Sequence, residues 1–308
     1  MRLLTVVLLV QVAIGIGLVA VVLSDVPLVG NLGIGESAES NVPVEAAVAR
    51  APADRFDEAR AFGWLRRQVE IGPRPAGSPE SRRLARLLRA RLPGGRFQAV
   101  PGRLRNVIGL VPGRDPSRTV VVGAHYDTKD EDDFVGANDA ASGTAVVMEL
   151  ARAIRPQTLR PTIVFILFDG EESPRGADDE DFEKAGLRGS KIAAPAYRAA
   201  EAMILLDFVG NRNLSIAREA NSNPALWYRL RQAAGRVGAG RAFPRRVESP
   251  ISDDHLPFIR AGVPSIDLID SNFLRGPCWH QPCDDLRGVS ARSLDLSGET
   301  VFELLRTL

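Results

Sequence analysis

Residues 161–172 read PTIVFILFDGEE, an apolar run that stops at a cluster of acidic residues. An unbroken apolar run of this length is typical of a strand that is buried on both faces of a sheet. Shorter runs of the same kind occur at residues 119–124 (TVVVGA) and 202–206 (AMILL). These runs therefore predict central strands of one sheet, each of which ends in polar residues.

Segments with helical spacing alternate with these strands. Further strands are expected at residues 106–113 and 264–270, and helices at 79–92, 139–155, 223–236 and 255–261 and from about 290 onward. This alternation predicts an α/β fold, a three-layer α/β/α sandwich around a central mixed, mostly parallel sheet. In such sheets, ligands bind beyond the carboxyl ends of the strands.

The composition excludes several classes of protein. The chain has 308 residues, with 39 Lys and Arg against 38 Asp and Glu, and a net charge of +1. A chain so nearly neutral lacks the charge expected of a nucleic-acid binder, so no nucleic-acid partner is expected. Its two cysteines can form one disulfide but no disulfide scaffold. With only three histidines in the chain, the position of each is informative.

The N-terminus contains an apolar stretch, residues 3–23, in which only Thr5 and Gln11 are polar. This stretch is long enough to cross a hydrocarbon core of about 30 Å. Arg2 precedes it, and the positive-inside rule then holds the short N-terminus in the cytoplasm. We therefore expect residues 1–24 to be a membrane anchor, with a cleaved signal peptide as the alternative. Both interpretations place the remaining chain outside the cytoplasm, either membrane-anchored or secreted.

Two segments follow this N-terminal stretch. Residues 25–53 mix Gly, Pro, Ser and Glu without sustained periodicity, which predicts a flexible linker. The folded domain is expected to cover residues 54–308.

Polar residues gather where the apolar runs stop. His125 and Asp127 follow the first strand, Glu171 and Glu172 follow the next, and Asp207 follows the third. Asp139 lies at the start of a predicted helix, and His280 lies in a late loop. Each has an ordinary alternative role as a cap, turn or solvated residue. Together they form the mixed histidine and carboxylate set that zinc accepts. Two adjacent glutamates allow one to bind metal while the other moves protons.

These motifs resemble the zinc aminopeptidase and glutaminyl cyclase superfamily. The resemblance covers residues 60–308 and rests on His125-x-Asp127, the stretch GANDAASG at 136–143, Glu171-Glu172, Asp207 and His280. It implies that Asp139, Glu172 and His280 bind a zinc ion and that Glu171 is the general acid and base. In the aminopeptidase branch a second metal is bound by His125 and Asp207, and Asp127 orients His125. The resemblance therefore implies one Zn²⁺ in a cyclase and two in an aminopeptidase.

The branch is indicated by other motifs. Several stretches are similar to the corresponding motifs of cyclases, namely FVGA at 134–137, LDFVG at 206–210, DDHLPF at 253–258 and Trp279. In that branch Asp207 and Asp253 form an acidic relay beside Glu171, and Trp279 lines the substrate pocket. The N-D-x-x-S-G pattern and the CWHQPC stretch at 278–283 are similar to secreted aminopeptidases, and the Trp that animal cyclases place after the glutamate pair is missing.

The resemblance also bears on the two cysteines and on His255. Cys278 and Cys283 are expected to form a disulfide around His280, as in some aminopeptidases, because the chain is placed outside the cytoplasm. Unpaired core thiols and thiolate metal ligands are the alternatives. His255 is expected to support the site without binding the metal.

The favoured function is that of a zinc-dependent enzyme acting on the N-termini of peptides or proteins. We expect a glutaminyl-peptide cyclotransferase, which converts an N-terminal Gln to pyroglutamate and releases ammonia. A zinc aminopeptidase is the alternative. A membrane-tethered peptide-binding domain is the alternative without catalysis.

Overall fold

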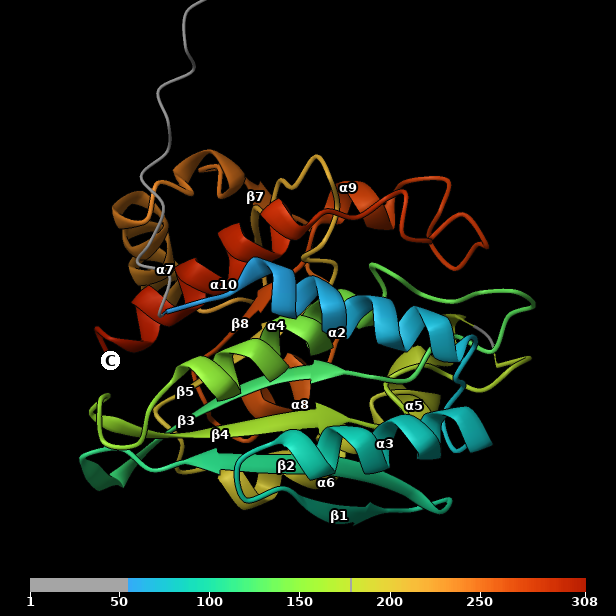
Figure 1. Cartoon of the computed structure of the whole chain (residues 1–308), viewed down its shortest axis with the longest axis horizontal. Coiled ribbons are helices and arrows are strands. Elements are labelled where there is room, and N and C mark those ends of the chain that lie inside the picture. The colour runs from blue at the N-terminus through green and yellow to red at the C-terminus, as the bar shows by residue number, and fades with distance from the viewer. Residues whose placement is uncertain (1–54, 178) are drawn as a thin grey trace, which may run out of the picture. The chain divides into compact units, whose positions relative to one another are not determined.

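The computed structural model describes residues 55–177 and 179–308, and its centre is a six-stranded sheet (Figure 1). The strand order is β1-β2-β4-β3-β5-β8. The strands are β1 (Arg96–Val100), β2 (Leu104–Val111), β3 (Asp115–His125), β4 (Pro161–Phe168), β5 (Ala202–Leu206) and β8 (Ser265–Leu268). β3 runs parallel to β4 and β5, and β5 parallel to β8, whereas β1 and β2 are antiparallel to their neighbours. The predicted mixed, mostly parallel sheet is therefore confirmed.

Helices cover both faces of this sheet. They are α2 (Glu58–Ile71), α3 (Pro79–Arg91), α4 (Ala141–Ala153), α5 (Phe182–Ala185), α6 (Arg188–Ala193), α7 (Pro224–Arg236), α8 (His255–Arg260), α9 (Ser271–Leu274) and α10 (Ala291–Leu305). Short 3₁₀ turns occur at Asp179–Asp181, Ala194–Tyr197 and Gly240–Ala242, and the small strands β6 (Arg218–Glu219) and β7 (Val247–Glu248) pair with each other.

Strand alternation divides the core in two. Val120 and Val122 of β3 pack into the larger core with α2, α3, α4, α7 and α10, whereas Val121 points into the smaller core. The smaller core is completed by side chains such as Ala193 of α6 and Phe258 of α8. Because side chains of a strand alternate between faces, continuous apolar strands require a helical layer on each side. The three-layer α/β/α sandwich expected from the sequence is confirmed.

Two helices show how the sequence positions the site. α3 begins where expected, because the Ser78 side chain accepts the N–H of Ser81 and Pro79 occupies the first turn. α4 begins at Ala141 rather than at residue 139, so Asp139 lies in the loop before the helix. Gly143 lets α4 approach β5 closely, since a Cβ there would lie 2.0 Å from the carbonyl oxygen of Leu206.

The structure adds elements that the sequence did not indicate. α2 and β1 were not predicted, and β3 begins at Asp115 rather than at residue 119, with a register shift between Asp115 and Thr119. The predicted anchor at residues 1–24 and the linker at 25–53 lie outside the described residues, and the boundary at 54 stays a prediction. Among the residues that are described, no helix is both long enough and apolar enough to cross a membrane.

Glu299 of α10 gives the fold a pH-dependent contribution to stability. Its Oε1 accepts the N–H of Phe56 at 3.2 Å, and its Oε2 lies 3.2 Å from Nη2 of Arg55. Burial raises the pKa of Glu299 from 4.5 to about 7. The folded chain therefore binds more protons than the unfolded chain between these two pH values.

We expect Glu299 to lower the free energy of unfolding as the pH rises from about 4.5 to about 7, by roughly 1–3 kcal/mol. Glu299→Gln should remove this slope, as measured by urea unfolding at pH 5 and pH 8. Glu303→Gln, on the same helix and beside the same Arg55, is the matched control and should keep it. An unchanged slope in Glu299→Gln would contradict the assignment.

Candidate metal and active site

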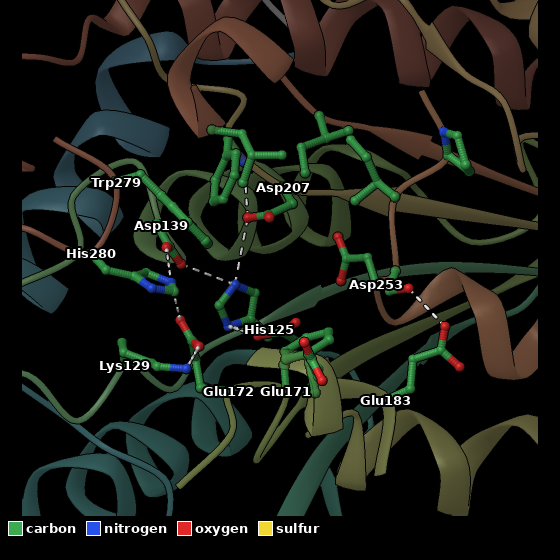
Figure 2. Close-up of a pocket in the computed structure, with 18 residues that line it drawn as sticks. His125, Lys129, Asp139, Glu171, Glu172, Glu183, Asp207, Asp253, Trp279 and His280 are labelled. Atoms are coloured by element: carbon green, nitrogen blue, oxygen red, sulfur yellow. Dashed lines mark hydrogen bonds and ion pairs between the residues drawn. The ribbon is translucent and has the colours of Figure 1, made fainter. Parts of the chain in front are cut away.

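A cavity of about 560 Å³ lies at the carboxyl ends of the parallel strands (Figure 2). His125 is the last residue of β3, Glu171 and Glu172 follow β4, and Asp207 follows β5. Because these strands are parallel, their ends bring residues far apart in sequence to one edge. The cavity is lined by the side chains of His125, Asp139, Glu171, Glu172, Asp207, Asp253, Trp279 and His280, all of which were singled out from the sequence.

Asp139, Glu172 and His280 form the first candidate metal site. Their ligand atoms all lie within 4.8 Å of one another. Nε2 of His280 lies 3.4 Å from Oδ2 of Asp139 and 3.2 Å from Oε1 of Glu172. Tetrahedral ligands at zinc-like bond lengths stand about 3.4 Å apart, so this set fits a zinc-sized ion. Oδ2 of Asp139 is buried with no hydrogen-bond partner, which is expected of an atom that binds a metal.

His125, Asp139 and Asp207 form a second candidate site. Nε2 of His125 lies 3.4 Å from Oδ1 of Asp139 and 3.5 Å from Oδ1 of Asp207. The two oxygens of Asp139 thus face two different imidazoles. A carboxylate in this position can bind one metal or bridge two.

The pKa values of the site residues follow from this arrangement. Burial raises the pKa of Asp139, but the nearby imidazoles of His125 and His280 outweigh burial and lower it. Burial disfavours the charged form of His280, yet Asp139 and Glu172 raise its pKa to about 10. Asp139 is therefore held ionised, the form that binds metal.

Asp127 fixes the segment that carries both glutamates. Its carboxylate accepts the backbone N–H groups of Gly170, Glu171 and Glu172 at 2.9, 3.3 and 3.3 Å. Its Oδ1 also lies 3.8 Å from Nδ1 of His125. One buried carboxylate thus sets the position of Glu171 and Glu172 and faces the ring of His125.

The loop that carries Asp139 is held by the N-D-x-x-S-G motif. Oδ1 of Asn138 accepts the N–H of Gly210 at 2.8 Å. Oγ of Ser142 donates to the carbonyl of Asn138 at 2.5 Å and accepts the N–H of Val209 at 3.1 Å. These bonds tie the Asp139 loop to the segment after Asp207.

Asp284 is a positioning residue that the sequence did not reveal. Its carboxylate accepts the N–H of Asn138 at 2.8 Å and the N–H of Asp139 at 3.0 Å. Burial and the charge of Asp139 raise the pKa of Asp284 to about 7. The sequence offers one signal for Asp284, the acid pair directly after Cys283, and this pair resembles an ordinary solvated turn.

Arg74 was also missed. It is fully buried, and its guanidinium donates to the carbonyl oxygens of Tyr126, Val135 and Gly136. Burial lowers the pKa of Arg74 to about 10, with opposing contributions from Asp139, Asp284 and Asp127. The guanidinium thus places a positive charge behind the acidic site. Nothing in the stretch GPRP around it distinguishes it from a surface arginine.

Glu171 is suited to hold or release a proton. Its carboxyl group is buried at the cavity, with Oε2 3.8 Å from Nδ1 of His125. Burial raises the pKa of Glu171 well above its usual range; His125 opposes this, and the charges of Glu172, Asp253 and Asp254 add to it. Burial likewise raises the pKa values of Asp207 and Asp253. These carboxyl groups form the acidic wall of the cavity.

His255 lies behind this wall and does not line the cavity. The ring is fully buried, with Nε2 3.3 Å from Oε1 of Glu219 and Nδ1 3.9 Å from Oδ2 of Asp267. Oε2 of Glu219 accepts the N–H of Ile251, a residue of the cavity wall. His255 belongs to neither candidate metal site among the described residues, and its supporting role stays a prediction.

Lys129 also lines the cavity, and its side chain was not predicted from the sequence to belong to the site. Its Nζ donates to Oγ of Ser173 at 2.6 Å and lies 3.5 Å from Oε2 of Glu172. It follows the His-x-Asp motif by two residues, but a lysine beside an acidic run has the ordinary interpretation of a solvated side chain.

A disulfide between Cys278 and Cys283 encloses the loop of His280, so the predicted pairing is confirmed. The Cα atoms are 5.2 Å apart, and His280 has a positive φ of 54°. The Trp279 ring lies 4.2 Å from the His280 ring, and Phe134 meets that ring edge-on at 5.7 Å. The loop therefore presents a metal-ligand candidate and a pocket aromatic from one constrained segment.

The fold and the site define a class of enzyme. The chain belongs to peptidase family M28, whose model matches residues 106–305. It is similar to the glutaminyl-peptide cyclotransferase of Bothrops jararaca, with 29% identity over 218 residues. That match covers 58% of this chain and 58% of the relative, so it spans somewhat more than half of the relative's length.

Two solved structures are also similar. A glutaminyl cyclase of Porphyromonas gingivalis has 31% identity and a TM-score of 0.72, with 81% of this chain and 98% of that chain covered. A leucine aminopeptidase precursor from Bacteroides thetaiotaomicron VPI-5482 has 26% identity and a TM-score of 0.74, with 82% and 98% covered. The superfamily resemblance is therefore confirmed. The chain is a member of this enzyme superfamily and is similar to its glutaminyl cyclase-like branch.

A substitution of Asp284 tests the site while every ligand candidate stays in place. Asp284→Asn keeps one acceptor oxygen and loses the other, so one of the two N–H groups at residues 138 and 139 loses its partner. We expect the affinity for zinc to fall about 10- to 100-fold, measured by competition with a chromogenic chelator. Asp285→Asn, at the neighbouring and more exposed position, should leave the affinity unchanged. Equal affinities in wild type and Asp284→Asn would show that Asp284 does not position Asp139.

Proposed function

We propose that this enzyme is a zinc-dependent glutaminyl-peptide cyclotransferase, which closes an N-terminal Gln to pyroglutamate. The observation that carries the proposal is the position of Glu171. Its buried carboxyl group lies between the triad of Asp139, Glu172 and His280 and the acidic side chain of Asp253 (Figure 2). The similarity to named glutaminyl cyclases supports the same reaction.

The candidate ligands fit a zinc ion in donor type, spacing and burial. Asp139, Glu172 and His280 would hold it. When bound there, zinc supplies a Lewis acid that polarises the γ-amide carbonyl of the substrate.

Glu171 carries out the proton transfers in this proposal. The α-amine of the substrate attacks the γ-carbonyl carbon, a C–N bond forms, and Glu171 takes a proton from the amine. Glu171 then gives that proton to the departing amide nitrogen as the second C–N bond breaks, and ammonia leaves. A carboxyl group with a raised pKa suits both steps, because proton transfer in each direction is easier when the pKa lies nearer to neutral pH.

Asp207 and Asp253 would assist Glu171 by accepting hydrogen bonds from the groups around it and by donating hydrogen bonds to them. Both are buried beside the cavity, and the charge of Asp253 helps raise the pKa of both Glu171 and Asp207. The apolar side chains of Phe208, Ile269 and Trp279 line the same cavity. They would exclude water, which otherwise competes with the amine by hydrolysis.

An aminopeptidase is the second candidate, and one observation favours it. The two candidate metal sites share Asp139, which is the arrangement that a pair of metal ions requires. In that reaction Glu171 would take a proton from an attacking water molecule. A binding domain without catalysis is disfavoured, because the chain belongs to an enzyme family and keeps a complete set of ligand candidates.

The substrate and the compartment follow from the same proposal. Peptide or protein N-termini would enter the cavity at the strand ends. The disulfide at Cys278 and Cys283 fits an oxidising, extracytoplasmic compartment. Anchoring through residues 3–23, or secretion after cleavage, is part of the proposal.

Product analysis tests the reaction directly. Purified protein loaded with zinc is incubated with a peptide that begins with Gln and with one that begins with Leu, and the products are weighed by mass spectrometry. We expect the Gln peptide to lose one ammonia and the Leu peptide to remain intact. Removal of the N-terminal residue from either peptide would establish the aminopeptidase instead.

Replacement of the two glutamates separates the proton carrier from the metal ligand. Glu171→Gln keeps the size of the side chain, so we expect bound zinc near the wild-type amount and activity reduced about 10²- to 10⁴-fold. Glu172→Gln should lose zinc, together with the thermal stability that metal binding adds by mass action. Zinc is measured by elemental analysis and stability by calorimetry. A zinc-loaded and fully active Glu171→Gln protein would show that the roles are exchanged or that the site is wrong.

A further inference from the structure

A second cavity of about 350 Å³ lies between α2, α3 and α4, helices that Figure 1 shows on one side of the molecule. It is lined by side chains from the later turns of α4, whereas Asp139 precedes the first turn of that helix. The two cavities share no lining residue. We call the second cavity the arginine pocket, because its lining includes Arg60, Arg66, Arg67, Arg91 and Arg152.

Three of these arginines are held by carboxylates. Arg152 binds Glu149, with its Nε 2.9 Å from both carboxylate oxygens. Nε of Arg60 lies 2.9 Å from Oδ2 of Asp57, and Nε of Arg66 lies 3.5 Å from Oε1 of Glu70. Each of these contacts uses only part of a guanidinium group, which has five N–H donors, so donors remain for a ligand.

The other two arginines have no carboxylate within ion-pair distance among the described residues. Arg67 lies over the ring of Trp64, with its guanidinium carbon 5.4 Å from the ring centre. Arg91 ends α3 and faces the same cavity from a different helix. The pocket therefore has an excess of positive charge, in a chain whose net charge is only +1.

Gly63 is a second and independent sign that the space is kept open. It lies inside α2, where glycine destabilises a helix relative to alanine. A Cβ at this position would meet no atom within 4 Å, so packing does not require glycine. A larger side chain here would extend into the pocket that Gly63 lines.

We propose that the arginine pocket binds a phosphate-bearing anion. Guanidinium groups approach it from α2, α3 and α4. A single fork can satisfy a planar carboxylate, but a tetrahedral phosphate presents oxygens in several directions and more charge. The pocket is larger than one phosphate group, so it also has room for an organic part against Trp64 and Met148. This binding does not depend on the proposed reaction.

Two sources of phosphate fit this chemistry, a soluble phosphorylated molecule and a lipid headgroup. Titration of the full chain with inorganic pyrophosphate in a calorimeter tests the first. Co-flotation with phosphatidylglycerol vesicles, against phosphatidylcholine vesicles, tests the second. Comparing variants of the same full chain removes any contribution of residues 3–23 to vesicle binding.

We expect saturable binding in at least one arm, weakened at least tenfold in the double variant Arg67→Gln/Arg91→Gln. Gly63→Leu should fill the pocket and weaken binding to a similar degree while raising the Tm. Arg83→Gln/Arg86→Gln is the matched control, since it removes the same charge from exposed positions of α3 outside the pocket, and it should bind as wild type does. Zinc content and peptide turnover should be unchanged in all three, which separates this test from that of the active site.

Three results would overturn the proposal. Binding in neither arm would exclude a phosphate site. An equal loss in the Arg83→Gln/Arg86→Gln control would assign any binding to diffuse surface charge, and wild-type binding by Gly63→Leu would place the ligand elsewhere.

Discussion

The carboxyl edge of the sheet buries more acidic side chains than it has cations to match, and the architecture of the site depends on this imbalance. Asp127, Asp139, Glu171, Glu172, Asp207 and Asp253 are all buried there, and the cations facing them among the described residues include His125, Lys129, Arg74 and the half-buried His280. Burying an unpaired charge is strongly unfavourable. A divalent cation between Asp139 and its neighbours would offset this cost, and protonation would offset it at Glu171, Asp207 and Asp253, whose pKa values are raised. Metal binding and proton storage would thus both follow from one buried acidic edge.

Much of this edge could be predicted from the sequence, because its residues follow apolar strands directly. The end of the strand PTIVFILF places Glu171 and Glu172, and parallel pairing with β3 then brings His125 beside them. The supporting residues could not be predicted in the same way. Arg74 and Asp284 act through bonds to backbone groups more than 50 residues away in the chain, and no periodic pattern records such contacts. α2 escaped prediction because the polar Gln68 interrupts its buried face, which otherwise contains the fully buried Ala61 and Leu65.

The overall fold does not separate cyclisation from peptide hydrolysis, since solved structures named for each activity superpose on this chain with nearly equal TM-scores, 0.72 and 0.74. In the proposed site, Asp207 is the residue whose state would differ between the two reactions. As an ionised ligand it would help His125 and Asp139 hold a second metal ion. As a protonated acid it would donate a hydrogen bond within the acidic wall. Burial and the nearby charge of Asp253 favour the protonated form, and hydrogen bonding to His125 opposes it. The outcome of that competition would decide how many metal ions the site holds.

His280 shows how a ligand candidate can be positioned without a helix or a strand. It lies in a loop at positive φ, a conformation that L-residues other than glycine adopt rarely, so the loop must be constrained from outside. The disulfide of Cys278 and Cys283 closes the loop on both sides of His280. Asp284, the next residue, then binds the backbone N–H groups of Asn138 and Asp139. The position of His280 is therefore coupled to that of Asp139 through the disulfide and the two hydrogen bonds of Asp284, so that the two ligand candidates are held in place together.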